Sequence, residues 1–488
     1  MSPTLIATIV STYFLVLLVI TYFTSRNATN HTFFLGNKKS PWYVIAFGMI
    51  GASLSGVTFM SVPGNVLNTQ FTYMMMVIGF LAGYIVIATI LMPLYYRLNL
   101  TSIYSYLEGR FGNSTYKTGA SFFLLSRIIG ASLRMFIVVN VLQIFVFDAW
   151  NVPFFVTIII FIVSILIYTF NGGIRTIIWT DTLQTTFMLL AVVLSIVFIS
   201  KELHLSLGGL IAKVFQSDYS KIFEIDWSSK QFFLKQFFSG AFIAITMTGL
   251  DQEMMQKNLS CRSLKDAQKN MFTFSVVLVF VNLMFLILGA ILIFYSNSRG
   301  ISVAHTDDLF PTIAIKNLTP IAGIIFIIGL ISAAYPSADG ALTSLTTSFC
   351  IDILGLNKFG FTEEKKIKIR YAVHILFAVI LMACIFVIRS INDEAIIQKL
   401  YKIAGYTYGP LLGLYSFGMF TKWQVKDKWI PLVALVSPTV CYFLSVYSTQ
   451  LFWGYNIGFE LIILNGGLTF FGLWLLRKPR TEVLSTNN

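Results

Sequence analysis

Long apolar runs separated by short polar segments make up most of this chain. A membrane-spanning helix needs roughly 20 consecutive, mainly apolar residues, and about thirteen runs reach or approach that length. The runs are continuous, whereas a membrane β-strand alternates apolar and polar residues over roughly ten positions. The pattern therefore predicts an all-α, polytopic membrane protein with about thirteen spanning helices. The runs cover residues 5–24, 42–67, 72–96, 118–146, 152–170, 178–200, 236–255, 271–295, 318–350, 371–388, 400–420, 429–447 and 455–476.

The polar segments between the runs are too short to form domains of their own. The two largest, residues 201–235 and 296–317, fall well below the usual size of a domain. We therefore expect residues 1–480 to form one transmembrane domain, followed by a short polar tail over residues 481–488.

Lysine and arginine are distributed unevenly between the two sets of loops. With the N-terminus outside, one set carries about twice as many of these residues as the other, and cytoplasmic loops are the ones enriched in them. This cytoplasmic set includes Lys257, Lys265 and Lys269. The distribution predicts a multi-pass protein of the plasma (inner) membrane, with the N-terminus outside and the C-terminus in the cytoplasm.

Composition excludes several classes of protein. Only 11% of the residues are charged, about half the share of a soluble domain, and 56% are hydrophobic. The net charge of +13 is spread over short clusters, so we expect a lipid bilayer as the partner of these charges and no nucleic acid. The four histidines and four cysteines are scattered without metal-ligand or nucleophile–base spacing, so we expect no enzyme activity.

Two of the apolar runs are interrupted by glycine and hydroxyl residues. One extends from Phe47 to Asn65, and the other, five runs later, extends from Ser239 to Gln252 and contains Thr246 and Thr248. Interrupted helices at matching places in two halves are typical of an inverted repeat with a binding site at the membrane midplane. The alternative is that the small residues only allow close helix packing.

Four charged residues fall inside the apolar runs: Asp181, Asp339, Arg127 and Arg134. An intramembrane charge costs roughly 2.5–3.5 kcal/mol on insertion scales, so each one needs a functional or structural reason. Arg127 and Arg134 are seven residues apart and lie on one face of a helix. The alternatives to a binding role are an arginine–aspartate salt bridge within the bundle and, for Asp181, a position at the start of a helix.

At these positions the sequence resembles the sodium/solute symporter family. The resemblance runs through FFLGNKKSPWYVIAFGMIGASLSGVTFMSVPG and five further ordered motifs, and the first block is most similar to the bacterial sodium–sialic acid symporters. It implies a LeuT-like inverted repeat of five plus five helices, with one extra helix before and two after. The core repeats would cover about residues 42–200 and 236–420. The further motifs are at residues 106–112, 171–184, 251–270, 330–353 and 403–420.

The resemblance also implies where sodium binds. The main site would use Gly51 and Leu54 of the first core helix, with Ala333 and Ser337 of the eighth, and oxygen ligands suit such a hard cation. The family usually has a hydroxyl residue where this chain has Pro336, whose ring frees a backbone carbonyl one turn earlier, near Ser332. A second sodium site of some members matches Asp339, Gly340 and Asp181. We therefore expect Asp339 to offset Pro336, either by adding charge to the sodium site or by binding a proton.

The positions that bind sialic acid in the family match Ser55, Thr58, Tyr73 and Val77. The sialic-acid member also uses an arginine, and its position matches Gly130, one turn from Arg127 and Arg134 on either side. The candidate solute contacts are therefore Ser55, Thr58, Tyr73, Val77, Arg127, Arg134, Thr246 and Thr248.

Together these features predict a monomeric secondary transporter that uses Na+ as its coupling ion and works by alternating access. The expected cargo is a sugar, a sugar acid or another small organic anion, carried into the cell. The alternatives are a proton-coupled or uncoupled carrier of the same fold, and a receptor that senses a solute without moving it.

Overall fold

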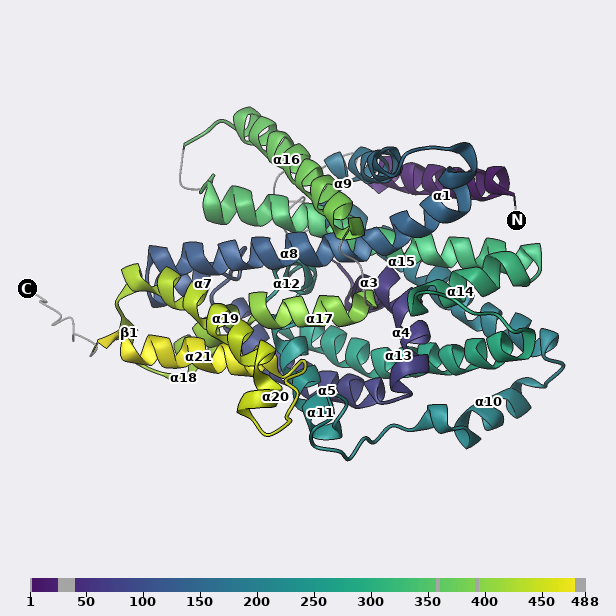
Figure 1. Ribbon diagram of the computed structural model, residues 1–488. Coiled ribbons are helices and arrows are strands. Elements are labelled where there is room, and N and C mark those ends of the chain that lie inside the picture. Colours follow the sequence, from purple (N-terminus) through teal and green to yellow (C-terminus); the bar gives the residue numbers. More distant parts are fainter. Residues whose placement is uncertain (1, 25–39, 357–359, 391–394, 479–488) are drawn as a thin grey trace, which may run out of the picture.

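Helices account for nearly all of the regular structure in the computed structural model (Figure 1). The structure describes residues 2–24, 40–356, 360–390 and 395–478, without the side chains of residues 171–175. The predicted tail over residues 481–488 lies outside the described residues. The long helices of the first half are α1 (Pro3–Thr24), α3 (Trp42–Ser53), α4 (Gly56–Thr69), α5 (Tyr73–Val86), α8 (Asn113–Leu142) and α9 (Phe154–Glu202). Those of the second half are α11 (Phe233–Ala244), α12 (Gln252–Leu259), α13 (Leu264–Arg299), α15 (Pro320–Ser348), α16 (Glu363–Ser390), α17 (Ile396–Thr407), α18 (Gly409–Phe420), α19 (Ile430–Val446) and α21 (Leu461–Leu475).

Shorter elements connect or extend these helices. The pair β1 (Gln424–Val425) and β2 (Arg477–Lys478) is antiparallel, with Gln424 opposite Lys478. Four helices are extended by a π-helical turn: Ile87–Leu91 follows α5, Gln143–Phe147 follows α8, Ile245–Gly249 follows α11 and Phe349–Ile353 follows α15. The remaining α-helices are α6 (Met92–Arg97), α7 (Ser105–Arg110), α10 (Leu207–Gln216), α14 (Leu309–Pro311) and α20 (Ser448–Leu451).

Every predicted apolar run contains a helix, as expected. Within the described residues, eight helices are long and apolar enough to cross a membrane, and two bent helix pairs raise the number to ten. The three remaining runs correspond to the first limb of α9, to α17 followed by α18, and to α21, each shorter than a full span or interrupted. The total of thirteen spanning helices therefore stays a prediction.

Both glycine-interrupted runs are broken helices, as predicted. The first bends by 56° between α3 and α4, where Leu54 and Ser55 leave the helical conformation. The second bends by 65° between the π-turn after α11 and α12. There Asp251 adopts an extended conformation and caps α12 by accepting hydrogen bonds from the backbone N–H groups of Glu253 and Met254. Each break exposes backbone groups that an unbroken helix would pair internally.

Helix α9, which has 49 residues, contacts α15 at two places that one straight helix could not both reach. Phe161 stacks on Tyr335 of α15 with ring centroids 5.5 Å apart, and Ala191 packs against Gly329 of the same helix. On a straight helix Phe161 and Ala191 would be about 45 Å apart, whereas Gly329 and Tyr335 are only about 9 Å apart. The predicted pair of adjacent spans is therefore present as two antiparallel limbs, Phe154–Phe170 and Thr176–Glu202.

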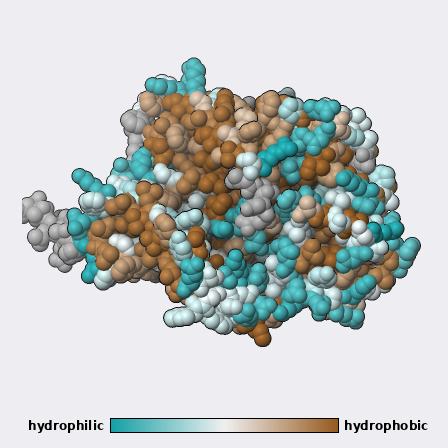
Figure 2. All heavy atoms as spheres, in the orientation of Figure 1, coloured by the Kyte–Doolittle hydropathy of each residue, from teal (hydrophilic) through white to brown (hydrophobic). Residues whose placement is uncertain are grey.

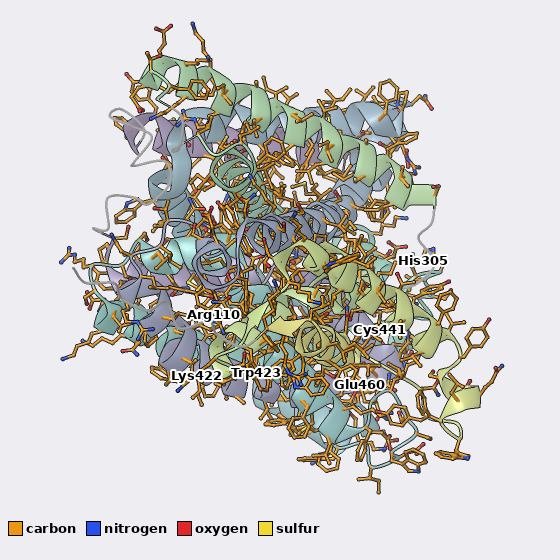
Figure 3. All side chains as sticks on the ribbon, turned by 90° about the vertical axis from the view of Figure 1, so that its left-hand side faces the viewer. Arg110, His305, Lys422, Trp423, Cys441 and Glu460 are labelled. Carbon is orange, nitrogen blue, oxygen red and sulfur yellow. The ribbon has the colours of Figure 1, made fainter. Side chains whose placement is uncertain are left out.

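The interior holds the broken helices against three long partners. Helix α3 packs on α9, α13 and α15, while α8 packs on α15, α16 and α17. At one end of the bundle, Arg110 donates hydrogen bonds to the carbonyl oxygens of Gly418, Thr421 and Trp423, and Figure 3 shows Arg110 beside Trp423. Hydrophobic residues cover much of the upper and left-hand surface in Figure 2, where lipid chains would replace water.

Candidate solute cavity and cation site

A cavity of about 670 Å³ lies at the break between α3 and α4. It is lined by the residues at the break, by α5, α8, α13 and α17, and by the π-turn before α12. Six of the eight predicted solute contacts line it: Ser55, Thr58, Tyr73, Arg127, Arg134 and Thr248. The structure thus brings together residues that are up to 193 positions apart in the sequence, from Ser55 to Thr248.

The other two predicted contacts do not line this cavity. Val77 is fully buried on α5, and Thr246 donates its hydroxyl to the carbonyl oxygens of Phe242 and Ile243 on its own helix. Sequence reasoning also missed Asn282 of α13 and Tyr401 of α17, which both line the cavity. Each is a polar side chain within or beside an apolar run, which is a signal for a functional position.

Tyr73 lies between two cavities. Its hydroxyl is hydrogen-bonded to that of Tyr401 at 3.0 Å, which joins α5 to α17. On its other side is a polar cavity of about 380 Å³, lined by Asn65, Gln236 and Gln398 among others. The Tyr73–Tyr401 bond therefore lies where the solute cavity and the second cavity adjoin.

The two arginines of α8 are paired differently. Arg127 makes salt bridges with Glu253 and, at 3.7 Å, with Asp251, which also accepts a hydrogen bond of 2.7 Å from Tyr408. Arg134 makes no ion pair with any described residue, and its Nε has no hydrogen-bond partner among them. The salt-bridge alternative from the sequence therefore holds for Arg127, whereas Arg134 lines the cavity without an ion pair and interacts with Asp251 only at longer range.

Gly130 lies between these arginines and lines a smaller cavity with them. That cavity has about 270 Å³ of empty volume and is also lined by Thr407 and Tyr408. Arg127 and Arg134 therefore flank Gly130, the position that the sequence resemblance matches to the arginine of the sialic-acid member.

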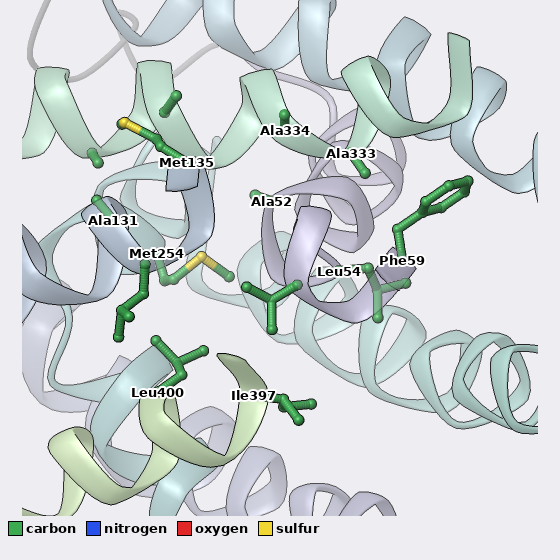
Figure 4. Close-up of a cluster of buried hydrophobic side chains, with 14 of the residues drawn as sticks. Ala52, Leu54, Phe59, Ala131, Met135, Met254, Ala333, Ala334, Ile397 and Leu400 are labelled. Carbon is green, nitrogen blue, oxygen red and sulfur yellow. The ribbon is translucent and has the colours of Figure 1, made fainter. Parts of the chain in front are cut away.

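The predicted sodium residues come from three helices that pack on one another: α3, α9 and α15. The N–H of Gly51 donates to Thr185 Oγ1 of α9 at 3.1 Å, and one turn earlier Gly48 lies against Asp181. Figure 4 shows Ala333 and Ala334 of α15 beside Ala52 and Leu54. The end of α3, the second limb of α9 and the middle of α15 therefore form one buried region.

Several oxygen atoms in this region lack a partner. Ser337 Oγ, Asp339 Oδ1 and Asp181 Oδ1 are buried and form no hydrogen bond with any described residue. Buried polar atoms are rarely left unsatisfied, and oxygen atoms are the ligands of hard cations. Pro336, inside α15, also has no N–H to donate to the carbonyl oxygen of Ser332. The donor set therefore fits a sodium ion.

Asp339 is fully buried and makes no ion pair with a described residue. Its Oδ2 accepts a hydrogen bond of 3.0 Å from the hydroxyl of Tyr168 on the first limb of α9. The carboxyl groups of Asp339 and Asp181 are close enough to interact electrostatically. Asp339 thus lies near Asp181, another residue of the predicted second sodium site, and is not part of a salt bridge among the described residues.

The charge count assigned Lys257 to a cytoplasmic loop, and this assignment is wrong. Lys257 is buried on α12, where its ammonium contacts Asp181 Oδ2 at 2.8 Å and Glu253 Oε1 at 3.4 Å. Sequence reasoning missed both Lys257 and Glu253. Their four-residue spacing, which places them on one helix face, was the available signal.

Known proteins resemble this chain in sequence and in fold. A sequence model of the sodium:solute symporter family matches residues 33–426. The chain belongs to this family. It is 25% identical to the sodium/sialic acid symporter NanT of Aliivibrio fischeri, over 92% of this chain and 89% of that protein. It is also 25% identical to the sodium/sialic acid symporter SiaT of Proteus mirabilis, over 93% and 92%. The substrate-bound, outward-open structure of a Na+-coupled sialic acid symporter covers 97% of this chain and 98% of its own, with a TM-score of 0.82 and 20% identity.

Membership of the sodium:solute symporter family confirms several sequence predictions. The chain is a transporter rather than an enzyme, its fold is all-α and LeuT-like, and Na+ is its coupling ion. It is a polytopic protein of the cell membrane that carries a small organic solute together with sodium.

Proposed function

We propose that this symporter carries a small organic anion of the sugar-acid type into the cell together with sodium. The observation that supports this cargo is Arg134, an unpaired guanidinium that lines the solute cavity. Arg134 is only partly buried, so its guanidinium can be reached from the cavity, and an arginine matches a carboxylate with two parallel hydrogen bonds. A solute carboxylate would supply the missing partner.

The rest of the cavity suits a hydroxyl-rich molecule. Ser55, Thr58, Thr248 and Asn282 offer hydroxyl and amide groups, while Tyr84 and Phe80 add aromatic surface. Such a lining, mainly apolar with a few convergent polar groups, is typical of small-molecule sites. Two relatives named for sialic acid support the sugar-acid class. Two positions that match sialic-acid contacts by the sequence resemblance lack the needed groups in this chain: Val77 has no polar group, and Gly130 has no side chain.

The proposed mechanism is alternating access, in a monomer with its N-terminus outside and its C-terminus in the cytoplasm. Sodium would be held by backbone oxygens of Gly51, Leu54 and Ala333 and by the side chains of Ser337, Asp339 and Asp181. The solute would bind against Arg134 on the other side of the α3–α4 break. Separation of Tyr73 from Tyr401 would open the solute cavity toward the 380 Å³ cavity.

The test is uptake by the purified full-length protein in liposomes. N-acetylneuraminate, gluconate and lactate are compared with glucose and proline, with sodium or choline outside. We expect sodium-dependent uptake of at least one monoanion. Arg134→Gln should weaken its binding about 10- to 150-fold, because a hydrogen bond to a charged group contributes roughly 1.5–3 kcal/mol. Arg134→Lys, which keeps the charge, should retain part of the affinity. Sodium-driven uptake of a neutral solute that is unaffected by Arg134→Gln would contradict the proposal.

A further inference from the structure

Lys257 brings a positive charge into the region predicted to hold sodium. Its side chain is only 2% exposed, and its ammonium is shared between Asp181 at 2.8 Å and Glu253 at 3.4 Å. An ammonium group on a four-carbon stem is mobile, and a small rotation suffices to move it between two carboxylates that it already contacts. The structure therefore gives Lys257 two alternative partners.

Asp181 is the partner that a sodium ion would also use. Lys257 contacts Oδ2 of this carboxylate, while Oδ1 is buried and has no partner among the described residues. Sodium on Oδ1 and ammonium on Oδ2 would place two positive charges on one carboxylate, and charges repel strongly where water is excluded. Binding of sodium at Asp181 therefore favours movement of Lys257 toward Glu253.

Glu253 is placed to receive the ammonium and to connect it with the solute cavity. Its Oε1 faces Lys257, its Oε2 pairs with Arg127, and the carboxyl group fills the space that a Cβ would need at Gly340, next to Asp339. Arg127 in turn lines the solute cavity. A chain of four ion-paired side chains thus runs from the solute cavity to the cation site: Arg127, Glu253, Lys257 and Asp181.

The charges of this cluster do not balance among themselves. Arg127 and Lys257 face three carboxylates, those of Asp181, Asp251 and Glu253. Arg134 interacts with Asp251 at longer range, and Asp339 adds a fourth carboxyl group nearby. Buried charges are tolerated when they are compensated. The four carboxyl groups outnumber the three cations, which would favour a further cation in a region that already contains an ammonium group.

We propose that Lys257 is a tethered competitor of the transported sodium ion for Asp181, and that Glu253 is the carboxylate to which Lys257 moves when sodium binds. The inference rests on the part of the proposed function that assigns Asp181 to the sodium site and does not depend on the solute. The two residues tune sodium affinity in opposite directions. Glu253 draws the ammonium away from Asp181, and Lys257 blocks Asp181 until it is drawn away.

Sodium alone is the probe for this proposal. The thermal unfolding of the full-length protein is measured as sodium chloride replaces choline chloride at constant ionic strength, for wild type, Lys257→Gln and Glu253→Gln. Lys257→Gln should lower the half-stabilising sodium concentration about tenfold, and Glu253→Gln should raise it about tenfold, which are typical couplings between linked sites. Lys265→Gln, which removes an exposed lysine of α13, should match wild type.

The outcomes separate this proposal from the proposed cargo. Unchanged or weaker sodium binding by Lys257→Gln would overturn it. If Lys257→Gln does not fold, Glu253→Gln decides, and unchanged or tighter sodium binding by that variant would overturn it. A sodium response that appears only in Lys257→Gln would support it, whereas no response in any variant would refute both the competition and sodium binding at Asp181. The absence of any transported organic anion would contradict the proposed cargo and leave the sodium result intact.

Discussion

Two arginines on one face of α8 serve different purposes because their surroundings differ. Arg127 is compensated by Glu253 and Asp251, so its charge belongs to the interior of the bundle. Arg134, two helical turns further on, lines the same cavity without an ion pair to any described residue. Removal of one member of a buried ion pair leaves the other charge without compensation where water is excluded. Removal of an unpaired charge leaves no such partner behind. The same substitution should therefore have different consequences at the two positions.

Arg127→Gln should lower the stability of the protein by about 3–5 kcal/mol, because it breaks a buried ion pair and leaves Glu253 and Asp251 without a full counter-charge. Arg134→Gln serves as the matched control and should unfold at the wild-type temperature or above it. Thermal unfolding of the purified protein without added solute measures both effects. Equal melting temperatures for the two variants would show that the ion pairs of Arg127 do not stabilise the fold.

Asp339→Asn should weaken sodium binding about tenfold or more, since it removes one negative charge beside the predicted ligands Ser337 and Asp181. The asparagine keeps the size of the side chain and can still accept the hydrogen bond from Tyr168. Sodium-dependent thermal stabilisation is the measurement, with Asp218→Asn, at an exposed position, as the control. Wild-type sodium affinity in Asp339→Asn would exclude a role for this carboxylate in sodium binding.

At the scale of elements, glycine determines how closely two helices approach. The backbones of α5 and α11 are in direct contact. A Cβ at Gly240 would overlap the carbonyl group of Met76, and a Cβ at Gly79 would overlap that of Phe237. Such contacts are common between membrane helices, where close packing replaces the hydrophobic driving force available in water. Since α5 carries Tyr73 and α11 leads to the break before α12, this contact fixes two walls of the solute cavity.

Gly240→Ala should destabilise the protein by roughly 1–3 kcal/mol, because the backbone of α5 cannot yield as a flexible side chain could. Gly208→Ala in α10 is the control, since a Cβ there meets no atom within 4 Å. Alanine also favours a helix over glycine by about 0.5–1 kcal/mol, so the control should be neutral or slightly stabilising. Thermal unfolding distinguishes the two variants, and a Gly240→Ala protein as stable as wild type would contradict the backbone contact.

At the scale of the whole molecule, the solute cavity and the predicted cation site both lie at the α3–α4 break. Leu54 belongs to both, since it lines the cavity and is a predicted sodium ligand through its backbone. In the proposed alternating-access mechanism, the two sites would therefore share an element that moves when the transporter changes its open side. Coupling then means that the sodium gradient sets the solute gradient. A tenfold sodium gradient is worth about 1.4 kcal/mol per ion, whatever the chemistry of the solute.

A monoanion carried with one sodium ion moves no net charge, so its transport should not depend on the membrane potential. A tenfold sodium gradient should then accumulate the solute about tenfold. Each further sodium ion would add about another factor of ten and a voltage dependence of roughly 2.3 kcal/mol per charge at 100 mV. Steady-state solute content of liposomes, with the potential clamped by a potassium ionophore, gives both quantities. Accumulation that persists in potassium or choline and collapses with a protonophore would indicate the proton-coupled alternative.

The sequence determined much of this protein because its strongest signals are local. Apolar runs predict helices wherever they occur, glycine and hydroxyl residues weaken the helices at residues 54–55 and 250–251, and intramembrane charges such as Arg134 and Asp339 are marked by their cost. The ordered motifs indicated the family, and the family indicated the coupling ion. These features depend on residues close together in the chain.

Tertiary structure alone decided which charges compensate one another. The sequence predicts a loop position for Lys257. In the structure, the bend before α12 directs its side chain inward onto Asp181, 76 positions away in the chain. In the same way, Val77 keeps the position of a family contact but faces the packed interior, and Asn282 and Tyr401 reach the cavity from distant helices. Pairing of buried charges is a property of distance, and distances between remote segments arise only when the helices pack.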